Sequence, residues 1–317
     1  MKFVYVLTTD FNNYLAEQCY LSQFSLLKFN KDAQIITITD QDTYSKLNSI
    51  PVKLIKKTSN IVKFDCPSTM SMKERSRYLK LQMRNIVDGD FLYVDSDTII
   101  CDNLFSVFET SSSISQIEDL HIPYLENKFL QNNTIPKIKK ANLTFSPVNY
   151  FNGGIIFSKD NKESRDFFNL ALQTWLKYES KDFCIDQVAY NYANHKMGNF
   201  ITPLDGIWNC QITENGIKYL TNVKIIHYFA TTNNSAFLLA HTDILNEIRI
   251  NNGITEKIED MIENAKSQFS DNAIILSDTN KIAVYNSKLF ALSLSLYKKA
   301  KPIFILINKL LKLFYKK

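Results

Sequence analysis

The sequence has few of the residues that mark disulfide-rich, repetitive or disordered proteins. Its 317 residues include five cysteines, an odd number, and no Cys-x-x-Cys pair. Only seven glycines and seven prolines occur, which argues against low complexity and long flexible linkers. We therefore expect the cysteines to be small buried side chains in a reducing cytoplasm. With 45% hydrophobic residues, the chain is long enough for one large domain, or for one domain and an appendage.

No early segment reads as a secretory signal. The chain begins MKFVYVLTTD, whose apolar part is short and runs into two threonines and an aspartate, so we expect a first core strand here. The residues after this strand read TTDFNNYL, without glycine or basic residues. A sugar-nucleotide pyrophosphorylase would have a glycine-rich, basic phosphate loop at this place. That class is therefore the least favoured of our hypotheses.

Acidic residues are absent from the end of the chain. None follows Asp278, whereas residues 281–317 contain nine lysines and no arginine. The formal net charge of +5 is therefore misleading, because the other 280 residues carry a net charge of −4. An enzyme that acts on nucleic acid would more often spread its basic surface over the body, so this distribution argues against one.

The tail KPIFILINKLLKLFYKK (301–317) has the pattern of a basic amphipathic helix. Its longest unbroken apolar run is five residues, far short of the about 20 that cross a bilayer. A helix of this kind lies on an anionic membrane surface. The alternative is a helix that packs its apolar stripe on the body of the protein. The stripe consists of Ile303, Leu306, Ile307, Leu310, Leu313 and Phe314.

Upstream of the tail, strand-like and helix-like segments alternate. We therefore expect an α/β fold with a mostly parallel sheet flanked by helices over residues 1–268, and a membrane-associating region over residues 269–317. The expected strands are 3–8, 34–39, 52–55, 91–100, 150–158 and 223–229. The expected helices are 14–29, 72–87, 161–178, 186–194 and part of 237–268. Residues 110–148 read as a long irregular loop, which in a compact domain is usually functional or mobile.

The run FLYVDSDTII (91–100) places two carboxylates inside a strand-like segment. Aspartate is depleted in strands, and a buried carboxylate is costly unless it is paired or bound to a metal. In an extended run, Asp95 and Asp97 point the same way. Hard oxygen ligands select Mg²⁺ or Mn²⁺, and ligands of parallel sheets bind beyond the carboxyl ends of the strands. A divalent metal at this place could hold a diphosphate.

The sequence contains two other Asp-x-Asp triplets, and neither is clamped by apolar residues. The triplet Asp40-Gln41-Asp42 looks like a helix start, and Asp88-Gly89-Asp90 looks like a tight turn. We expect neither to bind a metal. We likewise expect structural or surface roles for three of the four histidines, His121, His195 and His241.

Further short motifs accompany FLYVDSDTII along the chain. They are YVLTTD (5–10), SRYLKL (76–81), YFNGGIIF (150–157), DQVAYN (186–191) and KIIHYF (224–229). With this ordered set, the chain resembles the GT-A glycosyltransferases of family 8, the group that holds bacterial lipopolysaccharide galactosyl- and glucosyltransferases and glycogenin. The resemblance covers most of residues 1–230. It implies a GT-A fold, a nucleotide-sugar donor, most simply UDP-linked, and retention of the anomeric configuration.

The resemblance also implies a role for each motif. The implied ligands of Mn²⁺ or Mg²⁺ are Asp95, Asp97 and His227. The implied nucleotide contacts are Thr8, Thr9, Asp10, Tyr14 and Ser96. The implied sugar contacts are Arg77, Lys80, Asn152, Gly153, Gly154 and Asp186. The implied catalytic residues are Asp186 and Gln187.

Taken singly, these residues have structural interpretations as well. A histidine in an apolar strand, such as His227, is more often a satisfied core residue. Asn152-Gly153 could be a turn, Asp186 a helix cap and Arg77 a solvated helix residue. The order of the motifs along the chain favours the functional interpretation.

Two features depart from the family pattern. Retaining members follow the histidine with a glycine and then Lys-Pro-Trp, where the lysine contacts the diphosphate. This chain reads HYFATTNNSAF, with Ala230 in place of the glycine and Asn233 in place of the lysine. The arginine of SRYLKL, Arg77, is shifted by one place.

We therefore expect a metal-dependent hexosyltransferase that is peripheral at the inner face of the cell membrane. It would transfer a sugar to a glycan or lipid-linked acceptor in the synthesis of bacterial surface polysaccharide, capsule or lipopolysaccharide. Acceptor contacts are expected in residues 110–148 and 230–250. The alternative is a non-catalytic, membrane-associated protein that binds a nucleotide sugar or a glycan.

Overall fold

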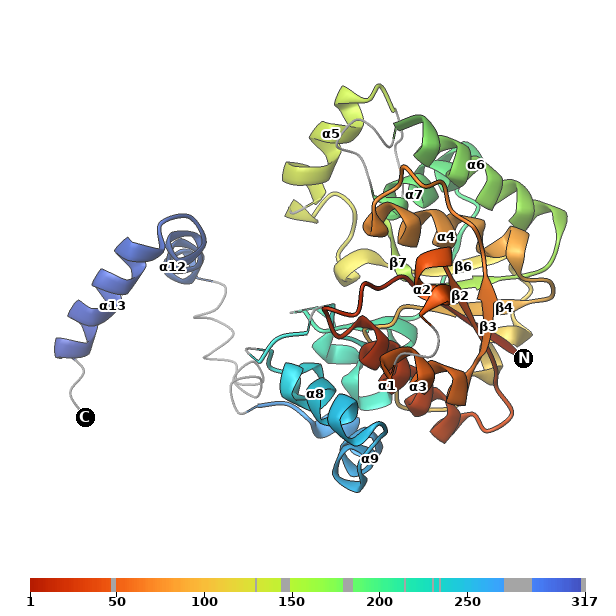
Figure 1. Cartoon of the computed structure of the whole chain (residues 1–317). Coiled ribbons are helices and arrows are strands. Elements are labelled where there is room, and N and C mark those ends of the chain that lie inside the picture. The colour runs from red at the N-terminus through yellow and green to blue at the C-terminus, as the bar shows by residue number, and fades with distance from the viewer. Residues whose placement is uncertain are drawn as a thin grey trace. The chain divides into compact units, whose positions relative to one another are not determined.

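The structure, a computed structural model, describes residues 1–46, 50–128, 130–143, 149–178, 185–213, 215–229, 231–233, 235–270 and 287–314 (Figure 1). The chain divides into two compact units, Met1–Gln268 and Phe269–Lys317. The first unit holds both sheets and most of the helices. In its described residues, the second holds two helices of the lysine-rich tail. Among the described residues, no helix is both long and apolar enough to cross a membrane.

The first unit is built on a seven-stranded sheet in the order β3-β2-β1-β4-β7-β6-β8. Strands β3, β2, β1 and β4 run parallel, whereas β7 runs antiparallel to both β4 and β6. The strands are β1 (Lys2–Leu7), β2 (Gln34–Thr39), β3 (Asn60–Lys63), β4 (Phe91–Val94), β6 (Ile114–Glu118), β7 (Phe151–Ser158) and β8 (Thr202–Pro203). The predicted mostly parallel α/β sheet is therefore confirmed.

A second, three-stranded sheet has the order β5-β10-β9. Its strands are β5 (Thr98–Ile100), β9 (Cys210–Gln211) and β10 (Ile225–His227). Strand β10 pairs antiparallel with β5 and parallel with β9. This small sheet brings the end of the FLYVDSDTII run next to the predicted histidine strand.

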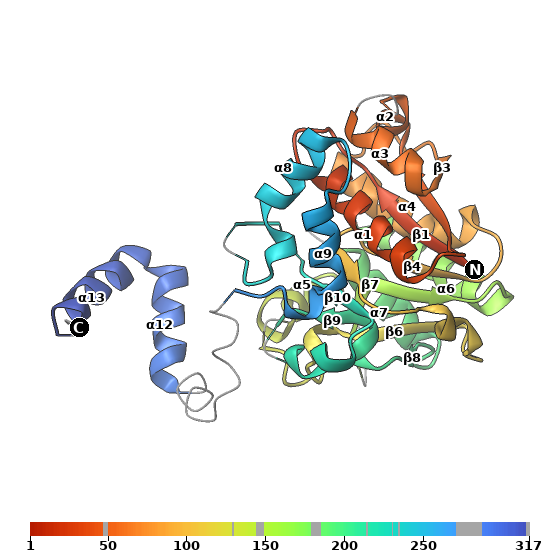
Figure 2. The same cartoon turned by 90° about the horizontal axis from the view of Figure 1, so that it is seen from below.

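Helices cover both faces of the large sheet (Figures 1 and 2). One face carries α4 (Met72–Ile86), α6 (Lys162–Tyr178) and α7 (Asp186–Lys196), which contact one another. On the opposite side, α1 (Leu15–Phe29) contacts α3 (Ile50–Thr58) and α8 (Thr242–Asn251). The remaining helices of this unit are α2 (Gln41–Ser45), α5 (Ile135–Lys140) and α9 (Glu256–Glu263).

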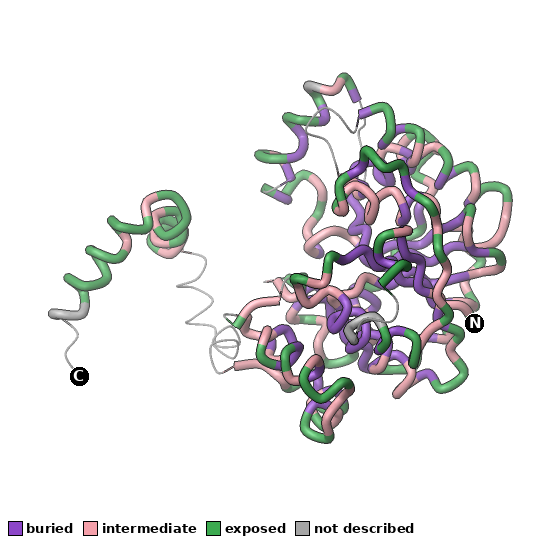
Figure 3. Tube along the Cα trace, viewed as in Figure 1, coloured by how far each residue is buried: buried purple, intermediate pink, exposed green. Residues whose placement is uncertain are grey.

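The core follows from the apolar content of the strands. Strands β4 and β7 are buried along their whole length, as expected for central strands covered on both faces (Figure 3). One large apolar cluster joins them to the inner sides of α4, α6 and α7, with Tyr93, Phe167 and Trp175 among its largest side chains. Removing such area from water contributes about 25 cal/mol per Å². The core therefore fixes the strand ends where the candidate site lies.

Two sequence-based expectations were wrong. Residues 52–55 were expected to form a strand, but they lie in α3, and the neighbouring strand is β3. The apolar residues there are spaced as in an amphipathic helix, with Leu54 and Ile55 fully buried and lysines before and after them. The irregular loop expected over 110–148 instead contains β6 and α5. Strand β6 was missed because its buried residues include Ser115 and Gln116, which are polar.

Most other elements agree with the predictions, including the strand around the glycine pair and the helices near 14–29, 72–87, 161–178 and 186–194. The two other Asp-x-Asp triplets also behave as expected. Asp40 is the N-cap of α2 and accepts from the amide of Thr43, and Gly89 has φ 74° in a turn. Cys184 lies outside the described residues, and the other four cysteines are buried and free.

In the tail unit, α12 (Lys288–Lys299) and α13 (Lys301–Phe314) are linked at Ala300. No described residue of either helix is buried, as Figure 3 shows. Leu306 and Leu310, for example, expose 59% and 50% of their surface. Within this unit, four residues of the apolar stripe predicted from the sequence are therefore uncovered: Ile303, Leu306, Ile307 and Leu310.

We predict that Ser71→Ala lowers the free energy of unfolding by about 1 kcal/mol. Ser71 caps α4, the helix that carries Arg77 and Lys80: its hydroxyl accepts from the amide of Glu74, whose carboxylate accepts from the amide of Ser71. Urea denaturation measures the effect. Ser68→Ala is the matched control, because Ser68 is exposed in the preceding turn. Equal stabilities of the two variants would contradict the role of the cap.

Candidate active site

The Asp95-Ser96-Asp97 segment lies where the chain leaves one sheet and enters the other. Strand β4 ends at Val94 in the large sheet, and β5 begins at Thr98 in the small one. The sequence suggested one extended strand over this run, but the structure has two strands with a break between them. The break is held by backbone bonds: the amide of Asp95 donates to Gly154 O at 2.8 Å, and the amide of Tyr228 donates to Asp97 O at 3.1 Å. Both carboxylates consequently lie at the carboxyl end of β4.

Two side chains, those of Tyr93 and Lys80, hold the Asp95 carboxylate. Its Oδ1 accepts from the hydroxyl of Tyr93 and lies 2.6 Å from Nζ of Lys80. Lys80 Nζ also lies 3.9 Å from Oδ2 of Asp186, so this ammonium bridges two acidic residues. The Oδ2 of Asp95 faces Gly154. Asp95 is thus oriented through one oxygen and keeps the other for a further partner.

His227 ends β10 and is almost fully buried. Its Nε2 lies 3.3 Å from Oδ1 of Asp97, and its Nδ1 lies 3.0 Å from Oδ1 of Asn209. Register places His227 opposite Thr98, the first residue of β5, so the antiparallel pairing brings the imidazole beside the acidic pair.

Asp95, Asp97 and His227 each offer one ligand atom, and these atoms all lie within 4.8 Å of one another. Two carboxylates and one imidazole suit Mn²⁺ or Mg²⁺, and such a set leaves coordination positions for other oxygens. The residues therefore fit the cation that the family resemblance implies. The predicted trio, although spread over 132 positions of sequence from residue 95 to residue 227, meets at one place.

The electrostatics of the site show the cost of two neighbouring carboxylates. Burial raises the pKa of Asp95 despite the attraction of Lys80. Burial acts in the same direction on Asp97, but the neighbouring His227 outweighs it and holds the pKa of Asp97 below its usual value. Burial lowers the pKa of His227, whereas the neighbouring Asp97 raises it. The net effect is a raised pKa of His227. A divalent cation between these groups would favour both ionised carboxylates.

Gly154 gives the cluster its space. A Cβ atom at this residue would lie 2.5 Å from Cε1 of His227 and 3.0 Å from Oδ2 of Asp95. At Gly153 the nearest atoms would lie at 3.8 and 3.9 Å, which is ordinary contact. The glycine pair was predicted to allow close approach to the backbone. At Gly154 the closely approaching groups are two candidate metal ligands, His227 and Asp95, and Oδ1 of Asn152, which would lie 2.9 Å from the Cβ atom.

Asn152 points into a buried polar network. Its Nδ2 donates to Oδ1 of Asp119 at 3.1 Å, and its Oδ1 accepts from Nδ2 of Asn209 at 3.0 Å and from the amide of Gly154 at 2.9 Å. Gln187 hydrogen-bonds to the Asp119 carboxylate, whose pKa is raised chiefly by burial. In this structure Asn152 therefore contacts Asp119, Asn209 and the backbone of Gly154.

A cavity of about 650 Å³ extends from the cluster toward the carboxyl end of β1. Among the predicted site residues, six line it: Thr8, Tyr14, Lys80, Asp95, Ser96 and Asp97. Sequence reasoning did not single out other residues that line it, including Gln18, Ser76, Phe229 and Thr231. Phe229 has φ 63° and its ring centre lies 4.3 Å from that of His227. Its backbone conformation is uncommon for a bulky residue, which favours a role at this site.

Two of the predicted nucleotide contacts do not line the cavity. Thr9 is buried, and its amide donates to the hydroxyl of Thr43. Asp10 is exposed and accepts from the amide of Asn12. Their part in nucleotide binding stays a prediction.

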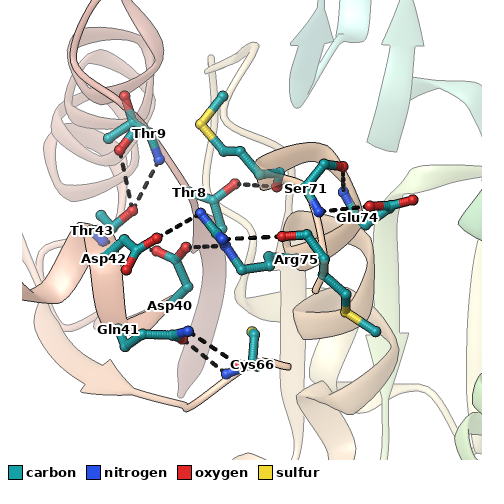
Figure 4. A network of polar contacts seen from close by, with 12 residues as sticks. Thr8, Thr9, Asp40, Gln41, Asp42, Thr43, Cys66, Ser71, Glu74 and Arg75 are labelled. Carbon is teal, nitrogen blue, oxygen red and sulfur yellow. Dashed lines mark hydrogen bonds and ion pairs between the residues drawn. The ribbon is translucent and has the colours of Figure 1, made fainter. Parts of the chain in front are cut away.

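The loop that carries these residues is braced by Arg75 of α4 (Figure 4). Its guanidinium pairs with Asp40 at 2.6 Å and with Asp42 at 2.9 Å. Asp40 in turn accepts from the amide of Thr43. The hydroxyl group of Thr43 accepts from the amide of Thr9. The first Asp-x-Asp triplet therefore forms an ion-pair network beside the cavity.

The two candidate catalytic residues begin α7. Asp186 is buried in the first turn, where its Oδ1 lies 3.8 Å from Nε of Arg77. Arg77 and Lys80 thus converge on Asp186, as a shared role near a sugar would require. Asp186, Gln187, Arg77 and the Asn152-Gly153-Gly154 segment lie beside the lining residues of the cavity, and their sugar-binding and catalytic roles stay predictions.

Asn233, in place of the family's lysine, is bound to the start of α8. Its Oδ1 accepts from the hydroxyl of Thr242 at 2.6 Å, and its Nδ2 donates to Asp243 at 3.2 Å. Ala230 lies outside the described residues. Two other histidines have structural contacts: His121 accepts from the amide of Gln211, and His241 bonds to the carbonyl of Ser235.

Two polar residues of the site were not predicted from the sequence. Asp119 follows β6, which lies in the segment read as irregular, and Asn209 precedes β9, a strand of two residues. A local signal existed only for Asp119, an acidic residue directly after the apolar-containing run ISQIE. Asn209 becomes visible only once β9 and β10 are paired.

No protein-family model matches this sequence, and neither does any curated protein. Solved structures do match. An active-site mutant of LgtC aligns with 82% of this chain and 99% of its own, at 16% identity and a TM-score of 0.55. The galactosyltransferase LgtC in complex with donor and acceptor sugar analogues aligns over the same shares, at 16% identity and a TM-score of 0.54. These likenesses confirm the predicted GT-A fold.

We predict that Gly154→Ala weakens Mn²⁺ binding about 10- to 100-fold, because the added methyl group displaces His227 or Asp95. Titration of Mn²⁺ followed by electron paramagnetic resonance gives the affinity. Gly153→Ala is the matched control in the same strand, since its methyl group would lie 3.8 Å from the nearest atom. Identical affinities of the two variants would show that Gly154 does not set the space of the site.

Proposed function

We propose that this protein is a glycosyltransferase that requires Mn²⁺ or Mg²⁺ and uses a nucleotide sugar, most simply a UDP-hexose, as its donor. The observation that supports it best is the meeting of Asp95, Asp97 and His227, since the two aspartates also line a cavity of about 650 Å³. The GT-A fold adds support, as does its likeness to a galactosyltransferase in complex with donor and acceptor sugar analogues.

The cation, when bound by Asp95, Asp97 and His227, would neutralise negative charge on the departing nucleoside diphosphate. The remaining lining residues suit the rest of the donor. Tyr14 presents an aromatic ring to the cavity, and Thr8 and Ser96 present hydroxyl groups. An aromatic face can stack a base, and hydroxyl groups can bind ribose or phosphate oxygens.

Lys80 is the candidate cation for the sugar end of the donor. Its pKa is raised, because the attraction of Asp95 and Asp186 outweighs the opposing effect of burial. It therefore stays charged at neutral pH and can offset the charge of acidic ligands. Asp186 and Gln187 would bind sugar hydroxyl groups near the anomeric carbon, with retention of configuration as the resemblance implies.

We predict that Asp95→Asn lowers Mn²⁺-dependent hydrolysis of the donor at least about 100-fold, because one anionic ligand is lost. The assay measures release of UDP from a panel of UDP-hexoses, with Mn²⁺ and with chelator, so it needs no known acceptor. Asp65→Asn is the matched control, since Asp65 is exposed and pairs with Lys63 at the surface. Unchanged hydrolysis by Asp95→Asn would refute the assignment.

The alternative, a binding protein without transferase activity, has one supporting observation. Asn233, where the family has a diphosphate-contacting lysine, is bound to α8. Thermal stabilisation by UDP-sugars and Mn²⁺ without any hydrolysis or transfer would favour this alternative, because a ligand that binds only the native state raises apparent stability. Release of UDP excludes it.

The tail is proposed to place the protein on the inner face of the cell membrane, where lipid-linked acceptors of surface glycans lie. In α13, exposed Ile303, Leu306 and Leu310 accompany lysines, and no acidic residue follows Asp278. Apolar side chains inserted at the interface and lysines near anionic headgroups act together in such helices. The tail thus complements a negatively charged lipid surface.

We predict that the full chain binds vesicles containing phosphatidylglycerol and that Leu306→Ser with Leu310→Ser reduces this partitioning at least about 100-fold. Burial of each leucine contributes about 1.5 kcal/mol or more. Co-sedimentation measures the bound fraction, and Asn308→Ser is the control on the same helix. Equal binding to vesicles of phosphatidylcholine alone would contradict the electrostatic part of the proposal. Equal binding of the double variant would contradict the apolar part.

A further inference from the structure

The side of His227 that faces away from Asp97 is occupied by a chain of hydrogen bonds. We call the residues of this chain, Asp119, Asn152 and Asn209, the amide relay. Its bonds run from Asp119 Oδ1 to Asn152 Nδ2 at 3.1 Å, from Asn152 Oδ1 to Asn209 Nδ2 at 3.0 Å, and from Asn209 Oδ1 to His227 Nδ1 at 3.0 Å. These three residues and His227 come from four elements, or their connections, that are distant in sequence.

The direction of the relay is fixed at its start. An ionised carboxylate only accepts hydrogen bonds, so Asp119 requires the amino group of Asn152. The backbone amide of Gly154 only donates, and at 2.9 Å it requires the oxygen of Asn152 on its side. The two contacts agree, so the amide of Asn152 has one favourable orientation.

This orientation passes on to Asn209. The Asn152 oxygen faces Asn209, so Asn209 must present its amino group there and its oxygen to His227. A flipped Asn209 would set two oxygens against each other and its amino group against Nδ1. Asn209 and His227 are 0% and 2% exposed, so water cannot easily replace the lost bonds.

The consequence concerns the imidazole hydrogen. A neutral imidazole carries one N–H, and the Asn209 oxygen requires it on Nδ1. The Nε2 atom then presents its lone pair toward Asp97, 3.3 Å away, where the candidate cation site lies. In free histidine the neutral ring prefers its hydrogen on Nε2, which would block a metal at this atom.

Two further observations concern the turn that follows Asp119. Leu120 and His121, directly after Asp119, both have left-handed backbone conformations, with φ 56° and 52°. This conformation is unfavourable for a leucine such as Leu120. Buried Gln211 holds the turn from both sides: it accepts from the amide of Leu120 at 2.7 Å and donates to Glu118 O at 2.8 Å.

We infer that Asn209, supported by Asn152 and Asp119, is a positioning residue that sets the Nδ1–H tautomer of His227 and so prepares Nε2 to bind the divalent cation. The inference rests on the proposed metal-dependent function for its purpose. The tautomer itself exists without any metal. The relay also reaches Gln187 through Asp119, so it connects the metal ligand with a candidate catalytic residue.

The test uses full-length protein with ¹⁵N-labelled histidine, free of metal and at alkaline pH, where the imidazole is neutral. Long-range ¹H–¹⁵N spectra distinguish the two tautomers, and His227→Gln identifies the signals of His227 among the four histidines. We expect an Nδ1–H tautomer in the unaltered protein. An Nε2–H tautomer there would overturn the inference without recourse to any variant.

Asn209→Leu removes both hydrogen bonds while keeping a similar shape. We expect loss of the fixed Nδ1–H tautomer and, in separate titrations, about 10- to 100-fold weaker binding of Mn²⁺. Asn194→Leu is the matched control: Asn194 is also buried and hydrogen-bonded, to the amide of Ile201, but it lies outside the relay. An unchanged tautomer in Asn209→Leu, or the same change in Asn194→Leu, would overturn the inference.

The two measurements separate this inference from the proposed function. If the unaltered protein bound no Mn²⁺ but its His227 tautomer depended on Asn209, the proposed function would fail and the relay would stand. If Mn²⁺ bound equally well to the unaltered protein and to Asn209→Leu, the relay would have no role in metal binding and the proposed function would stand.

Discussion

The site depends on the repulsion between two carboxylates at the end of a buried strand, which are separated in sequence by a single residue. Asp95 and Asp97 lie in a break between two sheets, where Asp95 has Lys80 as a close neighbour and Asp97 has His227. Burial makes their charges costly. A divalent cation held by both, together with His227, would offset this cost.

The fold brings these groups together by changing sheets. Strand β4 ends beside β7, whose Gly154 leaves room for the ligands, and β5 then pairs with β10 and aligns His227 with Thr98. A single extended strand would have left the imidazole on a different sheet edge. The amide relay contacts His227 at Nδ1, whereas Asp95 and Asp97 line the cavity.

Those parts of the fold whose signals are local could be predicted from the sequence. The residue pattern of the sequence predicted the helices near 72–87 and 186–194 and the buried strand that contains FNGG. The helical turn at Leu54 and Ile55 was misread, since a short apolar run fits either structure. Asp119 had one local signal, its place directly after the run ISQIE, but that segment was read as irregular. Asn209 could not be found, because its importance arises from the pairing of β9 and β10, and such long-range contacts leave no trace in a single sequence. That Asp95, Asp97 and His227 lie together was predictable only through the order of motifs.

The central claim is that one divalent cation is held jointly by Asp95, Asp97 and His227. Crystals of the full chain grown with Mn²⁺ and UDP, measured at a wavelength where manganese scatters anomalously, test it directly. The account predicts one strong anomalous peak in contact with both carboxylates and with Nε2 of His227, and with diphosphate oxygens on its open side. A peak at another place, or a structure in which Lys80 remains on Asp95 and no manganese is bound nearby, would contradict it.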